Sequence, residues 1–255
     1  MSLEKLIKIM EELRGDNGCP WDKEQTRGSL KPFLVEEVYE LLEALDEEDT
    51  EKIKEELGDL LFQIVFHCQI AKEMGQFDVN DVIEGIVRKM MSRHPHVFGD
   101  ADLKTSKEVL THWEEHKRKE GKIQESLLDG VPETLPSLLR AHKLQDKASR
   151  VGFDWEGVED VFKKLDEELQ ELRDAIGEKA EKAIEDELGD ILFVIVRISN
   201  FVGVNPEEAL RKTISKFIHR FRHIEIKAME HGKRLSDMTL QEMDAFWEEA
   251  KKDRI

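Results

Sequence analysis

The chain has 255 residues, of which 38% are charged and 39% hydrophobic, and its formal net charge at pH 7 is −18. This length allows two domains with separate cores, and the content of only 6 Pro and 15 Gly fits a helix-rich globular protein. The negative charge argues against nucleic acid polymers and anionic membranes as partners, although a bound divalent cation would still permit a nucleotide. Two cysteines outside any CxxC pair, and apolar runs too short for a membrane span, predict a reducing, cytoplasmic location.

Helical periodicity governs the first half of the chain. Leu3, Leu6, Ile7 and Met10 mark an amphipathic helix, and the segment 16–28, which contains Gly, Asn and Pro, is expected to be a loop. A second loop is expected at residues 94–100. The other helices of this half are predicted at about residues 30–45, 51–74, 82–92 and 106–119.

The second half repeats this plan after a segment with two Gly and two Pro residues, 121–136, which is the expected linker between domains 1–120 and 137–255. Gly177 stands where a C-terminal helix cap is expected. No alternating strand pattern is found, so the predicted fold class is all-α. Helices are predicted at about residues 138–149, 158–176, 182–202 and 207–231, with a short last helix that carries Trp247.

A carboxylate pattern of five members occurs twice along the chain. Each acid of the first copy maps onto its partner in the second by the same shift of 131 residues, which indicates two related units. The first copy is Glu36, Glu37, Glu40, Glu56 and Asp59, and the second is Glu167, Glu168, Glu171, Glu187 and Asp190.

Each copy spans two helices that are expected to form an antiparallel hairpin. Glu40 and Glu56 are each eight residues from position 48, and Glu37 and Asp59 are each eleven residues from it, so these pairs lie level across the hairpin. Four carboxylates this close repel one another unless cations neutralise them or some are protonated. Oxygen ligands without His or Cys favour Mg²⁺ or Mn²⁺ over zinc. The alternative is a solvated acidic face, which the duplication disfavours.

A basic pair follows each acidic pattern. Lys89 and Arg93 are four residues apart on one predicted helix face, and Lys216 and Arg220 repeat the spacing. A lysine beside a forked guanidinium suits phosphate oxygens. The alternative is an ordinary exposed basic face, which repetition beside an acidic cluster makes the weaker interpretation.

Taken together, these motifs resemble the MazG family of all-α nucleoside triphosphate pyrophosphohydrolases over nearly the whole chain. The resemblance rests on EExxE followed by ExxD within ELGD, in both halves, and on the positions of Trp247 and Lys251 near the end. The further matching segments are CPWDKEQTRGSL, KMMSRHPHVFGD, RVGFDWEG and KFIHRF.

The resemblance implies tandem MazG-like domains of the four-helix-bundle type, and a homodimer in which units of two subunits assemble. It also implies Mg²⁺-dependent hydrolysis of NTPs or dNTPs between the α and β phosphates, giving a monophosphate and pyrophosphate. The metal ligands would be Glu168, Glu171, Glu187 and Asp190 in the second domain, and Glu37, Glu40, Glu56 and Asp59 in the first.

The same resemblance assigns roles to the remaining residues. Glu167, or Glu36 in the first domain, would take a proton from the attacking water, and Lys164 would lie beside the substrate. The triphosphate would contact Lys216 and Arg220, or Lys89 and Arg93, while Trp247 and Lys251 would line the nucleotide pocket.

The two domains differ at one aligned position, because Phe33 stands where the second domain has Lys164. The second domain is therefore the expected site of catalysis. Two other functions stay open: a non-catalytic, nucleotide-responsive dimeric binding protein, and a narrower phosphatase specific for dUTP or pyrophosphate. Base selection depends on pocket shape, so the sequence does not fix it.

Overall fold

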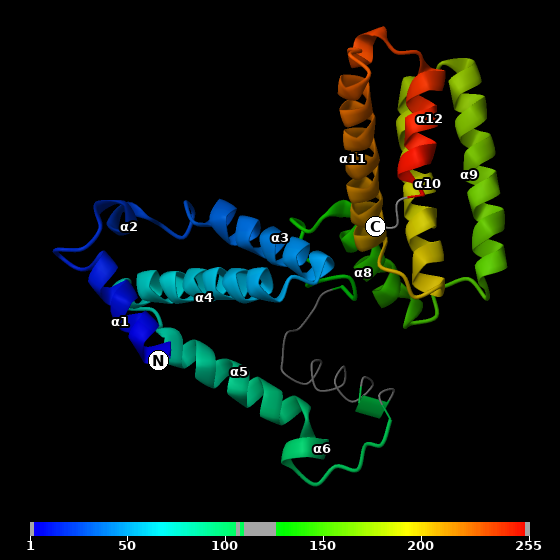
Figure 1. Ribbon diagram of the computed structural model, residues 1–255. Coiled ribbons are helices and arrows are strands. Elements are labelled where there is room, and N and C mark those ends of the chain that lie inside the picture. The colour runs from blue at the N-terminus through cyan, green and yellow to red at the C-terminus, as the bar shows by residue number, and fades with distance from the viewer. Residues whose placement is uncertain (1–2, 106–107, 110–125, 253–255) are drawn as a thin grey trace. The chain divides into compact units, whose positions relative to one another are not determined.

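The computed structural model describes residues 3–105, 108–109 and 126–252, and the chain divides into two units, Met1–Lys122 and Ile123–Ile255 (Figure 1). These described residues form helices, turns and loops without a strand, which confirms the all-α prediction. None of their helices is long and apolar enough to cross a membrane. The helix predicted at 106–119 lies almost wholly outside the described residues, as does the start of the predicted linker.

The first unit is built on two long helices, α3 and α4, with α1 packed against α4. Its core is formed by Met10, Leu30, Val65, Phe66 and Ile70. After α4, the chain turns into α5, which diverges from the α3–α4 hairpin (Figure 1). The helices of this unit are α1 (Leu3–Arg14), α2 (Pro20–Glu24), α3 (Lys31–Glu47), α4 (Thr50–Glu73), α5 (Val79–Arg93) and α6 (Pro95–Phe98).

Two short helices, α2 and α6, correct the prediction of uninterrupted loops at residues 16–28 and 94–100. Each begins at a proline, Pro20 or Pro95. A proline suits the first helical position because its fixed φ is helical and its missing N–H would have no partner there in any case. The sequence reading took these prolines as breaks and overlooked that they also begin helices.

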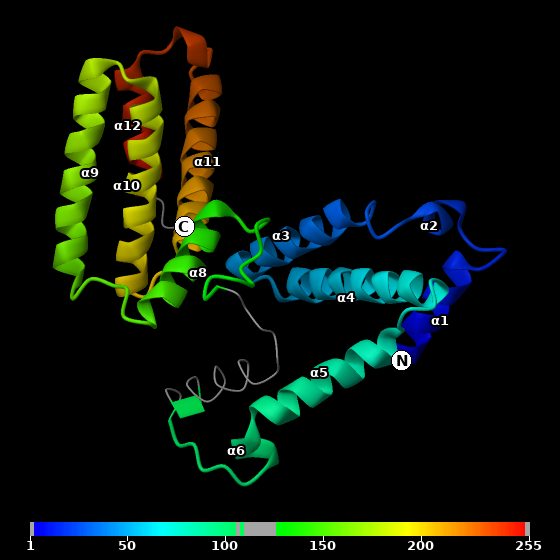
Figure 2. The same ribbon diagram turned by 180° about the vertical axis from the view of Figure 1, so that it is seen from behind.

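The second unit contains a longer hairpin of α9 and α10, which contact each other along their length (Figure 2). Helix α8 contacts both α10 and α11, and α12 packs on α11. Buried apolar residues from α9, α10 and α11 fill the interior, among them Val161, Val194 and Ile224. The elements are α8 (Ser137–Ser149), α9 (Val158–Glu178), α10 (Glu181–Phe201), α11 (Pro206–Glu230), the 3₁₀ helix η1 (Leu235–Asp237) and α12 (Leu240–Ala250).

The turns of the two hairpins occupy equivalent positions. Glu48 closes α3 with φ 53° and Lys179 closes α9 with φ 57°, so a residue in the left-handed region ends each helix. Asp49 then caps α4 by accepting hydrogen bonds from the backbone N–H groups of the following turn. Gly177 lies inside α9, so the prediction that it forms the cap was wrong. The left-handed conformation falls two residues later because the hairpin closes symmetrically about position 179.

Candidate metal and nucleotide site

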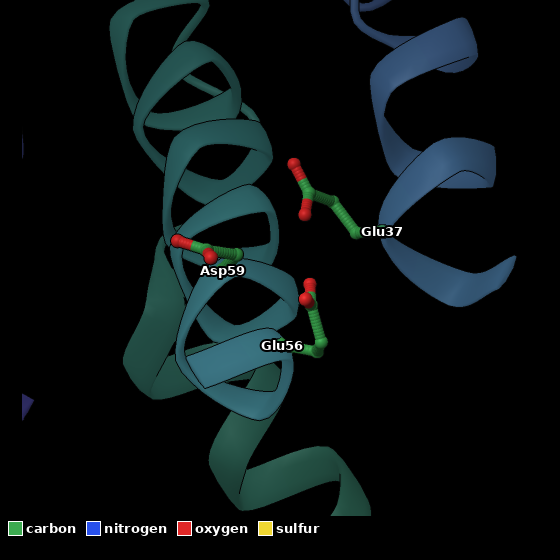
Figure 3. A group of neighbouring side chains, drawn as sticks. All are labelled: Glu37, Glu56 and Asp59. Atoms are coloured by element: carbon green, nitrogen blue, oxygen red, sulfur yellow. The ribbon is translucent and has the colours of Figure 1, made fainter. Parts of the chain in front are cut away.

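The α3–α4 hairpin brings three carboxylates of the first pattern together. Glu37 extends from α3 toward Glu56 and Asp59 on α4 (Figure 3), and the ligand atoms of these three side chains all lie within 4.8 Å of one another. Burial, followed by the charge of Asp59, raises the pKa of Glu37, and burial and the charge of Glu40 raise the pKa of Glu56. The acids therefore carry unfavourable mutual repulsion that a cation would relieve.

The α9–α10 hairpin forms the equivalent group in the second unit. Ligand atoms of Glu168, Glu171 and Glu187 lie within 4.8 Å of one another, and Glu168 is only 4% exposed. The pKa of Glu187 is raised by burial, by its hydrogen bond with Glu168 and by the charge of Glu171. The sequence pattern thus converges at the same place in both hairpins.

The fourth acid of each predicted ligand set lies just outside these close groups. Glu40 and Asp190 are exposed and do not belong to the sets within 4.8 Å. Their charges still act on the groups, because Glu40 raises the pKa of Glu56 and Asp190 contributes to raising that of Glu187. A bound cation or a rotamer change would be needed to draw them in.

Lys164 balances part of the charge in the second unit. Its Nζ lies 2.7 Å from a carboxylate oxygen of Glu167 and 2.7 Å from one of Glu168. These two contacts raise the lysine pKa. Glu167, like its counterpart Glu36 in the first unit, is exposed beside the buried acids. The predicted proton acceptor and the predicted substrate-contacting lysine are therefore paired in this structure.

The basic pair of the second unit lies on α11, where α12 covers it in part. The guanidinium carbon of Arg220 is 5.3 Å from the ring centroid of Trp247, and the ring of Phe217 is 5.4 Å from the same indole. Lys216 is exposed, and Lys251 forms an ion pair with Glu248. The structure thus joins Arg220 with Trp247, two residues that the sequence assigned to the substrate.

The basic pair of the first unit has a different setting. Lys89 is exposed on α5, whereas Arg93 is 7% exposed at the end of that helix. Helix α5 diverges from the hairpin that carries the acids (Figure 2). Within this unit, the predicted phosphate contacts and the predicted metal ligands therefore lie on elements that separate.

Gln63 is a neighbour of the acids that the sequence reading missed. It is 7% exposed, and a hydrogen bond between its side chain and Glu37 lowers the pKa of that carboxyl against the effect of burial. Gln63 follows Asp59 by four residues, so helical spacing alone placed it on the face of the acids. The surrounding apolar run concealed this signal.

Comparison with known proteins agrees with this architecture. The MazG nucleotide pyrophosphohydrolase domain matches twice, at residues 25–98 and 156–225. The chain is 46% identical over 249 residues to the nucleoside triphosphate pyrophosphohydrolase/pyrophosphatase MazG of Thermotoga maritima, covering 97% of this chain and 95% of that protein.

Two further relatives cover nearly all of this chain. The nucleoside triphosphate pyrophosphohydrolase of Escherichia coli K12 is 42% identical, covering 99% of this chain and 98% of that protein. The uncharacterized protein YabN of Bacillus subtilis is 51% identical, covering 95% of this chain and 50% of that protein. The resemblance seen in the motifs is confirmed, and this chain belongs to the MazG nucleotide pyrophosphohydrolase family.

Proposed function

We propose that this protein is a Mg²⁺-dependent nucleoside triphosphate pyrophosphohydrolase that cleaves NTPs or dNTPs between the α and β phosphates. The observation that carries the proposal is the convergence of three carboxylates in each hairpin, in a chain of the MazG family. Two units with intact acids fit an enzyme better than a binding protein, since binding alone would tolerate loss of one set.

The donor set fits a hard divalent cation. Each group offers only carboxylate oxygens, and one acid in each, Glu56 or Glu168, is buried. Oxygen ligands of this kind suit Mg²⁺, with Mn²⁺ as a close substitute, and disfavour zinc. We propose that Glu40 and Asp190 complete the two sets. A metal ion held there would offset phosphate charge and lower the pKa of a water molecule.

The chain's own groups would position the substrate and move the proton. Glu167, or Glu36 in the first unit, is exposed beside the buried acids and would accept the proton of the attacking water. Lys164 and Lys216 would hold phosphate oxygens, and the forked guanidinium of Arg220 would stabilise charge on the leaving pyrophosphate. The nucleotide pocket would be lined by Trp247 and Lys251, with ATP among its ligands, and Lys89 and Arg93 would serve the first unit.

We further propose a homodimer and two functional domains, 1–120 and 137–255. The division of the chain after Lys122 supports the domain limits. The dimer is supported by two exposed apolar stripes, on α4 and α10, which correspond under the shift of 131 residues. A matching hairpin of a second chain would cover such a stripe. The residues of the stripes are Leu57, Leu61 and Ile64, and Leu188, Leu192 and Ile195.

The experiment that tests the function is product analysis of the full chain. The protein is incubated with Mg²⁺ and each NTP and dNTP, and the products are separated by ion-exchange chromatography. Monophosphate plus pyrophosphate, abolished by a chelator, is the expected result. Diphosphate plus phosphate would contradict the reaction, and turnover restricted to dUTP or to pyrophosphate would indicate the narrower phosphatase.

Absence of turnover with retained nucleotide binding would indicate the dimeric binding protein. Sedimentation velocity over a range of concentrations tests the dimer, and Leu192→Asp should shift it toward monomer. The cytoplasmic location and the absence of nucleic acid partners stay predictions from the sequence.

A further inference from the structure

Three polar atoms are buried without a hydrogen-bond partner near the far end of the first hairpin. They are Gln63 Oε1, His67 Nε2 and Arg27 Nη2. Buried polar atoms in folded proteins almost always have a partner, so three in one region call for a ligand, ordered water or another chain. Gln63 is the most constrained of them, because it is 7% exposed and its side chain is hydrogen-bonded to Glu37 of the acid cluster.

These side chains continue the line of the cluster along α4. Asp59, Gln63 and His67 follow one another at intervals of four residues, so they share one face over about 12 Å of helix. Arg27 lies close enough to His67 for its charge to lower the imidazole pKa, after the larger effect of burial. The guanidinium also lies over the ring of Phe77, at 5.5 Å from its centroid.

The second hairpin replaces this polar line with apolar residues. Under the shift of 131 residues, Gln63 corresponds to Val194 and His67 to Ile198. Val194 is 5% exposed, so the position is buried in both units. The acids are thus kept in both copies, while the adjoining face of α4 differs in chemistry from that of α10.

We infer that the first unit holds its own nucleotide, with phosphates at the acid cluster and the polar edge of the base or sugar at Gln63, His67 and Arg27. The inference rests on the proposed function, because it requires cation-dependent phosphate binding at Glu37, Glu56 and Asp59. The free atoms include the amide oxygen as an acceptor and the guanidinium nitrogen as a donor. This mixture suits the edge of a nucleobase, whereas a bare anion needs donors only.

This chemistry assigns different selectivity to the two units. A site that hydrogen-bonds its ligand strongly rejects analogues that leave its buried groups unpaired, whereas an apolar pocket discriminates weakly between isosteres. The first unit would therefore select among bases, and the second, with Val194 and Ile198 at the equivalent positions, would be more permissive.

The test is calorimetric titration of the full chain carrying Glu168→Gln and Glu187→Gln, which disable the second acid cluster. The probes, each with Mg²⁺, are ATP, GTP, CTP, UTP and inorganic tripolyphosphate. One NTP should bind at least roughly tenfold more tightly than tripolyphosphate. Gln63→Val should weaken that NTP by roughly ten- to a hundredfold and leave tripolyphosphate within about twofold, since its phosphates contact only the cluster.

The second hairpin shows that valine is accommodated at this register, and Gln63→Met preserves side-chain length if Gln63→Val does not fold. Gln69→Val is the matched control, because it removes a glutamine amide from the same helix that is bonded instead to Glu73 at 2.9 Å. The control should leave every probe unchanged, and His67→Ile should act like Gln63→Val.

Two failures are distinguishable. If tripolyphosphate binds but no NTP binds more tightly, or if Gln63→Val weakens both equally or neither, the inference is overturned and Gln63 serves only to orient Glu37. If no probe binds in a Mg²⁺-dependent manner, the proposed function of the first unit fails, and the inference fails with it.

Discussion

In the second unit, Lys164 lies among the acids, 2.7 Å from both Glu167 and Glu168, whereas the equivalent residue of the first unit, Phe33, packs edge-on against Trp21 at 5.8 Å. The carboxylates that converge are the same in both hairpins, but only the second group contains an internal cation at this position. Identical candidate ligands can therefore differ in their demand for a metal ion.

This difference separates two tasks of an acidic site. A cluster without an internal counter-charge binds a cation tightly because the cation relieves all of the repulsion. A cluster with a lysine binds it less tightly, yet the ammonium group is then available to phosphate oxygens when the metal takes over the acids. The second arrangement suits turnover and the first suits retention of a bound ligand.

The largest effect is expected from disabling the acids of one unit. Glu187→Gln should lower kcat/KM of the full chain by roughly a hundredfold or more, because the variant loses a metal ligand and with it stabilisation of phosphate charge. Glu56→Gln should lower it by less than about threefold if the second unit carries catalysis. The measurement is pyrophosphate release, with circular dichroism to verify folding; the reverse ranking would place catalysis in the first unit.

A second comparison concerns a position within the packed part of each hairpin. Arg197 of α10 forms an ion pair with Asp154, with 2.9 Å between Nε and Oδ1, and the equivalent residue of α4 is the buried Phe66. Arg197→Met should destabilise the second unit by about 2 kcal/mol, less than for a fully buried pair because Asp154 keeps contact with solvent. Urea unfolding of the full chain measures this loss, and the transition of the first unit should not move.

The internal lysine can be exchanged between the two clusters. Lys164→Met should tighten Mn²⁺ binding at the second cluster by roughly tenfold, and Phe33→Lys should weaken it at the first by a similar factor. Mn²⁺ titration followed by electron paramagnetic resonance gives both affinities. Tighter binding without faster turnover in Lys164→Met would separate the two tasks, whereas unchanged affinities would refute the competition between lysine and metal.

The smallest expected effect is on the pH dependence of stability in the absence of divalent ions. The pKa of Glu187 is raised in the folded protein, so the folded state binds the proton more tightly than the unfolded chain, and stability falls as pH rises from the unfolded pKa through the folded one. Glu187→Gln should therefore raise the melting temperature at pH 7.5 more than at pH 4. Saturating Mg²⁺ should reverse the advantage at pH 7.5, and an equal shift at both pH values would contradict the repulsion.

Local patterns in the sequence were sufficient to predict most helices and the convergence of the acids. The spacing of Glu37 and Glu56 about a turn at Glu48 depends only on helix geometry and on the antiparallel pairing of neighbouring helices. The same reasoning placed Arg220 and Trp247 together only through the family resemblance. The short helices that begin at Pro20 and Pro95 were missed because a proline signals a break and a start with equal strength.

The sequence by itself determined that the chain is helical, duplicated and equipped with two acidic patterns, since each of these follows from periodicity and composition. Only the tertiary structure decided which acids approach within 4.8 Å, that Lys164 balances one group, and that Gln63 is buried against the other. The physical reason is that burial and side-chain pairing depend on how neighbouring helices pack. Residues on one helix face share a direction from the sequence alone, but their partners and their exposure to water are set across the hairpin.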